Sequence, residues 1–380
     1  MIWIVFGRDW MIVNRQVGLL GIVFALAWLA ACGGGGSGSG GSGNGSSGRS
    51  AYVAVPQANA ISAFRVDPSS GNFKAVLGSP FGGGTSPVSI VIHPSGKFVY
   101  AANQGGNDIS VFTIDSNTGE LTEAMPRTAA GLNPAALAID SAGDLLFAAN
   151  QTSNNISVYS ISSSDGKLAE IQGSPFATGA RPVALALSPS GKFLYVGSAN
   201  VAAVFGFSVA AGTGTLLAIP GSPFAVGGGP FSMTVDPSEH FLFVVNFTAN
   251  TVTGMSINAS SGALTLASGS PFAAATGPIS VTFHPAGQFL YVTNLGSNNV
   301  SVYSIDSTTG ATTQLTGSPF SAGTGPVSAT VDPAGKFLYV GNQSSKDITR
   351  LQIDSSTGLL SNSVTATTIN LAPSDIVFTK

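Results

Sequence analysis

The chain has 380 residues and a formal net charge of −3, and only 8% of its residues are charged, against about 25% in an average globular protein. No basic cluster occurs along it, which argues against a nucleic-acid partner, because phosphate neutralisation needs several Lys or Arg side chains. Cys32 is the single cysteine, so an intrachain disulfide is excluded and the fold must depend on packing.

The first segment reads as a secretory signal. Arg15 supplies the positive charge ahead of the apolar, uncharged run 17–31, and such a run is too short for a confident transmembrane helix but suits a signal peptide. Met11 makes a better start than Met1, because the first ten residues place Asp9 and a second apolar patch ahead of that charge. We expect residues 1–31 to be removed.

The signal ends in Leu-Ala-Ala-Cys at Cys32, which resembles the bacterial lipobox. That resemblance implies that Cys32 is diacylated and becomes the new N-terminus; the alternative is an ordinary signal peptide with an incidental cysteine. Residues 32–50 then form a lipidated cysteine and a Gly/Ser tether, since such a composition cannot bury apolar surface. Gly33 after the cysteine, by resemblance to the known sorting rule, favours the outer membrane, so we expect a lipid-anchored envelope protein.

A repeat occupies the rest of the chain, residues 51–380. Prolines that precede a short apolar segment recur at intervals of 47 or 48 residues, at Pro87, Pro134, Pro182, Pro230, Pro278, Pro326 and Pro373. A period this regular indicates a repeat architecture.

Each period predicts four strands. In 278–320, PISVTF, FLYVTN, NVSVYSID and ATTQLTGSPF alternate apolar residues and are separated by turn segments such as HPAGQ and STTG, which is typical of a β-propeller blade. Six periods are complete. Residues 51–81 contain strands two to four of another blade, and residues after Pro373 contain only a first strand. We therefore predict an all-β, seven-bladed propeller whose first blade is closed by the C-terminal strand, which leaves no free edge.

The strings YVTN at 291–294, HPSGKFVY and DPAGKFLYV resemble the YVTN-repeat, lactonase-like seven-bladed propellers, which are also labelled 6-phosphogluconolactonase-like or cycloisomerase-2-like. The resemblance covers 51–380 and implies the propeller fold. It also implies hydrolysis of a sugar lactone or lactonisation of a muconate. In the cycloisomerase branch the resemblance implies His, Arg and Glu around the channel, but we place no His or Glu there.

Propeller ligands usually meet the face that carries the loops between strands two and three and the loops that enter strand one. An asparagine ends strand two in most blades, and we list as ligand-face candidates Asn103, Asn150, Asn246, Asn294 and Asn342. Their repetition also fits a purely local turn role.

Charged residues that break the repeat on this face are the candidates for chemistry. Arg181 precedes a strand-one proline, and Arg127 is placed in the preceding inter-blade loop. Together they could grip a carboxylate or phosphate, or be two solvated loop residues. Asp108, Asp347 and Asp375 are the candidates for a base that activates water.

Other repeated residues are read as structural. His93 and His284 occupy positions held by Asp or Ser in other blades, next to tight turns. The histidines lie in separate blades, so we expect no metal site and no cofactor. The phenylalanine of each GSPF motif is expected to fill space between blades.

Two functions remain open. An uncharged Asn/Ser/Gly face on a lipid tether favours a monomeric binding or scaffold module for envelope glycan, peptide or protein, although residues 51–380 contain no Trp to stack on a sugar. The alternative is a lactonase that hydrolyses a sugar lactone at the channel mouth.

Overall fold

The computed structural model describes residues 48–380, and the expectations for the signal peptide, Cys32 and the tether up to residue 47 lie outside the described residues. In the described range, no helix is long and apolar enough to span a membrane. One short 3-10 helix, η1 (Pro56–Ala58), is the helix content of this range, as the strand periodicity predicted.

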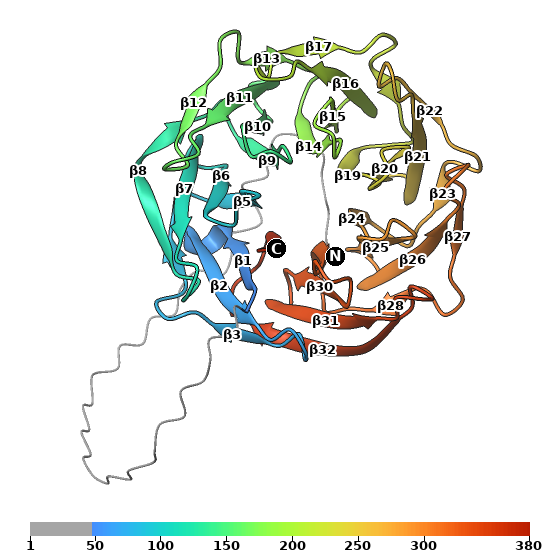
Figure 1. The fold of residues 1–380 in the computed structure, drawn as a ribbon. Coiled ribbons are helices and arrows are strands. Elements are labelled where there is room, and N and C mark those ends of the chain that lie inside the picture. Colours follow the sequence, from blue (N-terminus) through green and yellow to red (C-terminus); the bar gives the residue numbers. More distant parts are fainter. Residues whose placement is uncertain (1–47) are drawn as a thin grey trace, which may run out of the picture. The chain divides into compact units, whose positions relative to one another are not determined.

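Seven antiparallel sheets are arranged in a ring (Figure 1). The innermost strand of each sheet begins at or just after one of the repeated prolines. In chain order these inner strands are β5 (Pro87–Ile92), β9 (Pro134–Ile139), β14 (Pro182–Leu187), β19 (Pro230–Val235), β24 (Pro278–Phe283), β29 (Pro326–Val331) and β33 (Asp375–Phe378). The predicted seven-bladed propeller is confirmed.

The second and third strands pair around each loop. The second strands are β1 (Ser50–Val55), β6 (Phe98–Asn103), β10 (Leu145–Asn150), β15 (Phe193–Ser198), β20 (Phe241–Asn246), β25 (Phe289–Asn294) and β30 (Phe337–Asn342). The third strands are β2 (Ala60–Val66), β7 (Asp108–Ile114), β11 (Asn155–Ile161), β16 (Ala203–Val209), β21 (Thr251–Ile257), β26 (Asn299–Ile305) and β31 (Asp347–Ile353). The second strand of the first blade, β1, begins at Ser50.

The fourth strand is interrupted in five blades. It forms the short pairs β3 (Phe73–Ala75) and β4 (Phe81–Gly82), β12 (Leu168–Glu170) and β13 (Phe176–Ala177), β17 (Leu216–Ala218) and β18 (Phe224–Ala225), β22 (Leu264–Leu266) and β23 (Phe272–Ala273), and β27 (Thr312–Gln314) and β28 (Phe320–Ser321). In the other two blades it is continuous, as β8 (Leu121–Ala129) and β32 (Leu360–Thr368).

The GSPF motif lies at the interruption in each of these five blades, whereas β8, which contains Pro126 but no GSPF motif, is continuous. The serine of the motif accepts a backbone N–H from the third strand; Ser318 Oγ, for example, lies 2.8 Å from the Val302 nitrogen. The phenylalanine after the proline packs on the hydrophobic core in each of these blades, as Phe320 does. The structural interpretation of the motif is confirmed.

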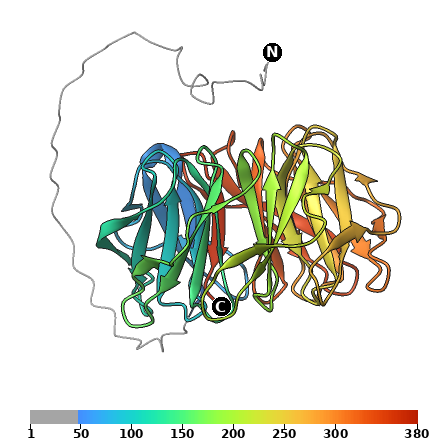
Figure 2. The ribbon, with the colours of Figure 1, turned by 90° about the horizontal axis from the view of Figure 1, so that it is seen from above.

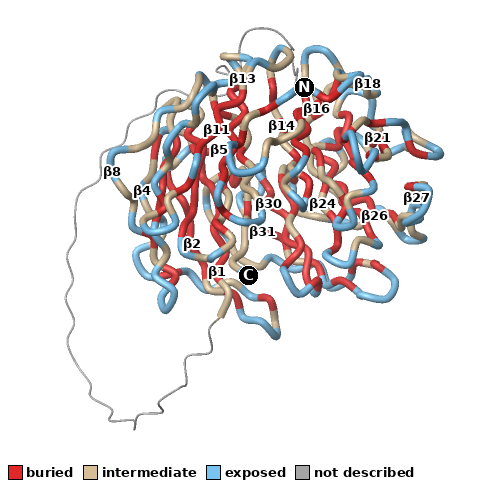
Figure 3. The backbone as a smooth tube through the Cα atoms, turned by 45° about the horizontal axis from the view of Figure 1, so that its top comes forward, coloured by how far each residue is buried: buried red, intermediate tan, exposed pale blue. Residues whose placement is uncertain are grey.

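The second strands form the most buried layer of the ring. All six residues of β6, β10, β15, β20, β25 and β30 are buried, and Figure 3 shows the buried segments running between exposed loops. Each strand faces a neighbouring blade on either side, so its side chains on both faces enter hydrophobic clusters between blades. This explains why FLYVTN and its relatives are apolar almost throughout.

In five of the seven blades the tyrosine of this motif joins the blade to the next. The hydroxyls of Tyr52, Tyr100, Tyr195, Tyr291 and Tyr339 donate, over 2.7–3.2 Å, to the carbonyl of a turn glycine in the following blade. Burial raises the pKa of Tyr52 to about 12, so these hydroxyls stay protonated donors.

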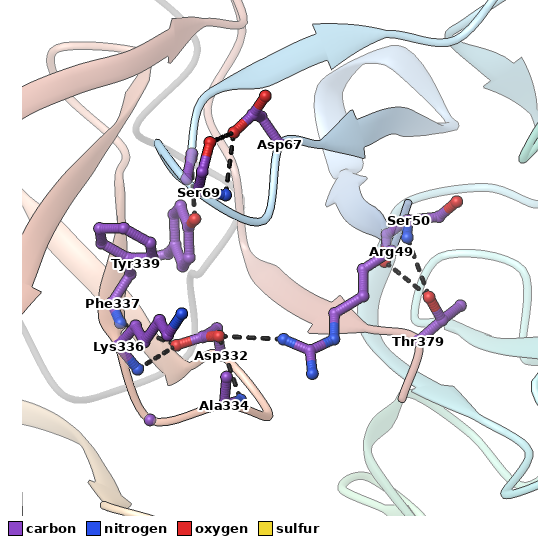
Figure 4. Close-up of polar contacts among 12 residues, drawn as sticks. Arg49, Ser50, Asp67, Ser69, Asp332, Ala334, Lys336, Phe337, Tyr339 and Thr379 are labelled. Atoms are coloured by element: carbon purple, nitrogen blue, oxygen red, sulfur yellow. Dashed lines mark hydrogen bonds and ion pairs between the residues drawn. The ribbon is translucent and has the colours of Figure 1, made fainter. Parts of the chain in front are cut away.

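The ring closes between the seventh and first blades (Figure 4). Strand β33 pairs with β1, and the Tyr339 hydroxyl lies 2.7 Å from the Gly71 carbonyl oxygen. The Arg49 guanidinium forms an ion pair with Asp332 at 3.1 Å. The predicted closure of the first blade by the C-terminal strand is confirmed. The described chain therefore begins and ends on one face of the disc, where Figure 2 shows the C-terminus.

Candidate functional site

The mouth of the channel is the end at which the inner strands begin. In six blades, a backbone hydrogen bond of 2.8–3.2 Å joins two positions at this end. The donor is the N–H of the residue that follows the second strand, and the acceptor is the carbonyl of the residue before the inner-strand proline. These two sets of positions therefore lie side by side at the mouth. The inner strands run from there along the channel, with one edge unpaired.

A second set of asparagines, which sequence reasoning missed, ties the mouth together. Each ends the loop between the second and third strands, and its side-chain oxygen accepts the N–H of the residue before the next blade's proline over 2.7–2.8 Å. They are Asn59, Asn107, Asn154, Asn250 and Asn298. Their spacing near 48 residues was visible in the sequence, but the contact between blades was not.

The asparagines expected on the ligand face are instead completely buried. Asn103, Asn150, Asn246, Asn294 and Asn342 are 0% exposed. Each amide nitrogen donates within its own blade, to the side chains five and seven residues later. The expectation that they meet a ligand is therefore corrected: they hold the loop between two strands.

Two of the three aspartate candidates belong to the same local network. Asp108 accepts from the Asn103 amide at 2.6 Å, and Asp347 accepts from the Asn342 amide at 2.8 Å. In the third blade the position equivalent to Asp108 and Asp347 is Asn155, whose neutral side chain accepts the same hydrogen bond from the strand-two asparagine. We assign both carboxylates to the loop structure.

Arg127 lies within strand β8, not in an inter-blade loop. Its guanidinium is paired with Glu123 of the same strand, at 2.7 Å through Nε and 3.0 Å through Nη2. The hydrogen bond and charge of Glu123 raise the pKa of Arg127. The expected joint grip of Arg127 and Arg181 on one anion is therefore not formed, because β8 is the outermost strand of the second blade.

Arg181 is at the channel mouth, as predicted from its place before Pro182. Its N–H donates to the Asn154 side chain at 2.7 Å, and its φ of 62° lies in the left-handed region. The equivalent residues in the sixth and seventh blades are glycines with φ of 65° and 69°. A long side chain in this conformation costs on the order of 1 kcal/mol relative to glycine. Ser86 and Asn133, the equivalent residues of the second and third blades, also adopt it, with φ of 56° and 54°, so the conformation is a feature of the repeat.

Asp375 lies at the start of β33 and is partly exposed at the channel wall. Its Oδ2 accepts the Ile90 N–H of the neighbouring blade at 3.0 Å, and its Oδ1 accepts the Ile376 N–H at 2.9 Å. Burial raises the pKa of Asp375 from 3.8 to about 6, against the opposing effect of these hydrogen bonds and of Ser89. Its carboxyl group is thus poised to exchange a proton near neutral pH.

The repeat shows what Asp375 replaces. We call the second residue after each inner-strand proline the latch position, because its side chain bonds the next blade. Ser89, Ser232 and Ser280 each accept a backbone N–H of the following inner strand over 3.2–3.3 Å. Asp375 makes the same bond with a carboxylate. A serine would meet this structural need without the unfavourable burial of charge.

Two latch positions carry alanine, Ala136 and Ala184. By the repeat, their partners would be the N–H groups of Leu185 in β14 and Met233 in β19. Because alanine has no side-chain acceptor, these N–H groups cannot receive the latch bond that Ser89, Ser232, Ser280 and Asp375 make. The remaining latch residue, Ser328, makes no such bond either. They are candidate hydrogen-bond donors to a ligand in the channel.

Ring order places these features opposite Asp375. Neighbouring inner strands contact one another in the order β33, β5, β9, β14, β19, β24, β29 and back to β33. In a ring of seven, β14 and β19 are therefore the two strands farthest from β33. Arg181 and Leu185 belong to the first of these, and Met233 to the second. Asp375 thus lies in the part of the ring farthest from Arg181, Leu185 and Met233.

The opposite end of the channel contains a cavity with a different lining. A cavity of about 310 Å³ lies there, lined mainly by Val91, Ile92, Ile139, Val331, Val377 and Phe378. This lining is apolar and has no titratable group, so the cavity is not the candidate catalytic site.

The histidines are structural, as predicted. His93 Nε2 lies 2.9 Å from the Gly143 carbonyl oxygen and His284 Nε2 lies 3.1 Å from the Gly335 carbonyl oxygen, each in the next blade. Within residues 48–380, no group of three or more His, Cys, Asp or Glu side chains could hold a metal ion.

The fold and site define a seven-bladed propeller with a carboxyl group of raised pKa at the channel mouth. The family model described as lactonase, 7-bladed beta-propeller, matches residues 44–183, 174–283 and 267–378. The chain therefore belongs to this lactonase family. No curated protein matches it significantly.

Solved structures share the fold at low sequence identity. A Bacteroides uniformis protein provisionally assigned as a 6-phosphogluconolactonase has 20% identity and a TM-score of 0.76, over 87% of this chain and 99% of that one. The periplasmic gluconolactonase of Pseudomonas aeruginosa has 19% identity and a TM-score of 0.75, over 87% and 99%. A Lactobacillus plantarum protein has 20% identity and a TM-score of 0.73, over 88% and 99%.

Proposed function

We propose that this protein hydrolyses a lactone ring at the mouth of the propeller channel, with Asp375 as the general base. The observation that carries the proposal is the Asp375 carboxyl group, which lies at the channel wall and whose pKa is raised to about 6. A base with such a pKa is mostly ionised at neutral pH and still accepts a proton from an attacking water molecule. Membership of the lactonase family supports the same chemistry.

The opposite wall supplies the other half of the reaction. Water attack on the lactone carbonyl produces a tetrahedral intermediate with a negative oxygen, which needs hydrogen-bond donors. We assign this role to the N–H groups of Leu185 and Met233, because the latch positions before them are Ala136 and Ala184. Arg181 at the same side of the mouth can bind a polar group of the substrate.

The reaction needs no further component. Asp375 takes one proton from water as the oxygen of that water bonds to the lactone carbonyl carbon. The ring C–O bond then breaks, and the leaving alkoxide receives a proton from the protonated Asp375. The product is a hydroxy acid. The binding or scaffold role loses part of its support, because the five asparagines expected on its surface are buried.

The decisive assay measures lactone hydrolysis by the full chain with three substrates: D-glucono-δ-lactone, its 6-phosphate, and an alkyl-substituted δ-lactone. We expect Asp375→Asn to lower kcat/KM at least 100-fold, and the wild-type kcat/KM to rise with pH through about 6. Asp347→Asn is the matched control, because asparagine occupies that position in the third and sixth blades, and it should stay within twofold. No hydrolysis above the spontaneous rate on all three substrates would refute the proposal.

A separate experiment tests whether the Met233 N–H binds the negative oxygen of the intermediate. Ala184→Ser introduces the residue found at most latch positions, and its hydroxyl should accept the Met233 N–H and remove it from the oxyanion. We expect kcat to fall about 100-fold while the melting temperature stays equal or rises. Unchanged kcat in a folded variant would remove this N–H from the mechanism.

We also propose that the protein works as a monomer in the bacterial envelope, anchored through lipid on Cys32. The support is the lipobox-like segment and the Gly/Ser composition after it. Expression in a Gram-negative host with a radioactive fatty acid tests this, with Cys32→Ser as control. Label in wild type but not in the variant is expected, and absence of label in both would contradict the anchor.

A further inference from the structure

The residues that surround the mouth differ between its two sides. The residue directly after the second strand is glutamine in the second, third and seventh blades, at Gln104, Gln151 and Gln343. In the fourth, fifth and sixth blades it is Ala199, Phe247 and Leu295. The backbone N–H of each of these six residues bonds the residue before the inner-strand proline, so all six stand at the mouth.

The apolar side is centred on two phenylalanines of the fifth blade. Phe247 bonds the Gly229 carbonyl through its N–H at 3.1 Å, and its ring lies 5.1 Å from the ring of Phe231. Both are partly exposed. Phe231 is the first residue after an inner-strand proline, where the other six blades have Val, Ala, Ile or Ser. Both aromatic residues therefore break the repeat at the same place.

Opposite sides of the mouth thus have opposite chemistry. Asp375 belongs to the first blade, between the glutamines of the seventh and second blades. The phenylalanines belong to the fifth blade: Phe231 is on β19, one of the two inner strands farthest from β33, and Phe247 directly follows β20. Arg181 lies in the neighbouring fourth blade.

We infer that the mouth binds a lactone that carries an alkyl substituent, with that substituent on Phe231 and Phe247 and the ring carbonyl toward the channel. This inference rests on the proposed function. A sugar lactone presents a hydroxyl on nearly every carbon, and the side chains of Ala199, Phe247 and Leu295 offer those hydroxyls no hydrogen-bond partner. Burial of a hydroxyl without a hydrogen-bond partner against an apolar surface is unfavourable, whereas burial of a hydrocarbon chain there is favourable because it removes apolar surface from water.

The repeat supplies a double variant that should fold. Phe231→Val uses the residue of the second, fourth and seventh blades at that position, and Phe247→Gln uses the glutamine of the second, third and seventh blades. The substrates are δ-decanolactone and D-glucono-δ-lactone, which share the six-membered lactone ring and differ in their substituents. Each is assayed with the full-length wild type and with the double variant.

We expect the double variant to lower kcat/KM for δ-decanolactone at least tenfold, mainly through KM, and that for D-glucono-δ-lactone less than twofold. An equal loss on both substrates, or no loss on either, would overturn the inference. Hydrolysis of D-glucono-δ-lactone without hydrolysis of δ-decanolactone would also overturn it, and would leave the lactonase proposal standing.

If neither lactone is hydrolysed, the proposed reaction is wrong. A binding measurement then tests whether the apolar subsite exists. The matching lactam of δ-decanolactone resists hydrolysis, so its affinity is measured by calorimetry. Binding to the wild type that weakens at least tenfold in the double variant supports the apolar subsite. Absence of binding to the wild type, or equal binding to both proteins, refutes it.

Discussion

Replacement of Asp375 by asparagine should stabilise the propeller at neutral pH. The pKa of this carboxyl group is raised from 3.8 to about 6 in the folded protein, so the folded state holds the proton more tightly than the unfolded state does. The free energy of unfolding therefore falls as pH rises from about 4 to above 6, and stays lowered at higher pH. About two pKa units correspond to roughly 3 kcal/mol.

The assay compares wild type and Asp375→Asn by urea and thermal denaturation between pH 4.5 and pH 8. Asparagine carries no charge and keeps one oxygen that can accept the Ile90 N–H, but its amide nitrogen cannot accept the Ile376 N–H, which offsets part of the gain. For a ring of roughly 330 residues, 3 kcal/mol corresponds to about 4 °C in Tm. The exposed turn aspartates, such as Asp67, whose pKa lies below its usual value, are common to both proteins, so their effect cancels in the difference.

The expected result is a stability advantage of the variant that is largest at pH 8 and shrinks toward pH 4.5, together with loss of hydrolysis. A difference independent of pH would refute the reasoning, because it would mean that the Asp375 carboxyl group is not perturbed in the fold. A variant destabilised at every pH would show that the carboxylate acts as a necessary latch and not as an unfavourably buried base.

Three further substitutions test the mouth and the core. Arg181→Gly relieves the left-handed backbone and should stabilise the protein by up to about 1 kcal/mol in urea unfolding while raising KM; a destabilised variant would contradict this. Gly84→Ala should lower the free energy of unfolding by about 2 kcal/mol, because its Cβ would collide with the Asn103 amide. Gly82→Ala is the control and should be neutral, because its Cβ would meet open space. Equal effects of the two substitutions would show that the Asn103 contact is unimportant. Tyr339→Phe leaves a buried carbonyl of the first blade unpaired and should lower the free energy of unfolding by about 1–2 kcal/mol, and an unchanged Tm would refute that.

The amino-acid sequence by itself determined the number of blades, the order of strands and the closure of the ring. These follow from local signals, namely alternation of apolar residues, turn residues and prolines spaced 47 or 48 residues apart. The repeat also pointed to Arg181 and Asp375, because each breaks a pattern that the other blades keep. Local chemistry of this kind needs no knowledge of neighbours in space.

The tertiary structure alone decided which candidates can act. Asn103 reads the same in the sequence whether its amide faces solvent or its own strand, and only packing shows that it is 0% exposed. Arg127 is neutralised by Glu123 through the conformation of β8. The raised pKa of Asp375 comes from burial between blades. Its position opposite Met233 comes from ring closure, which brings together residues more than 140 positions apart, and such long-range neighbours leave no local signal in the sequence.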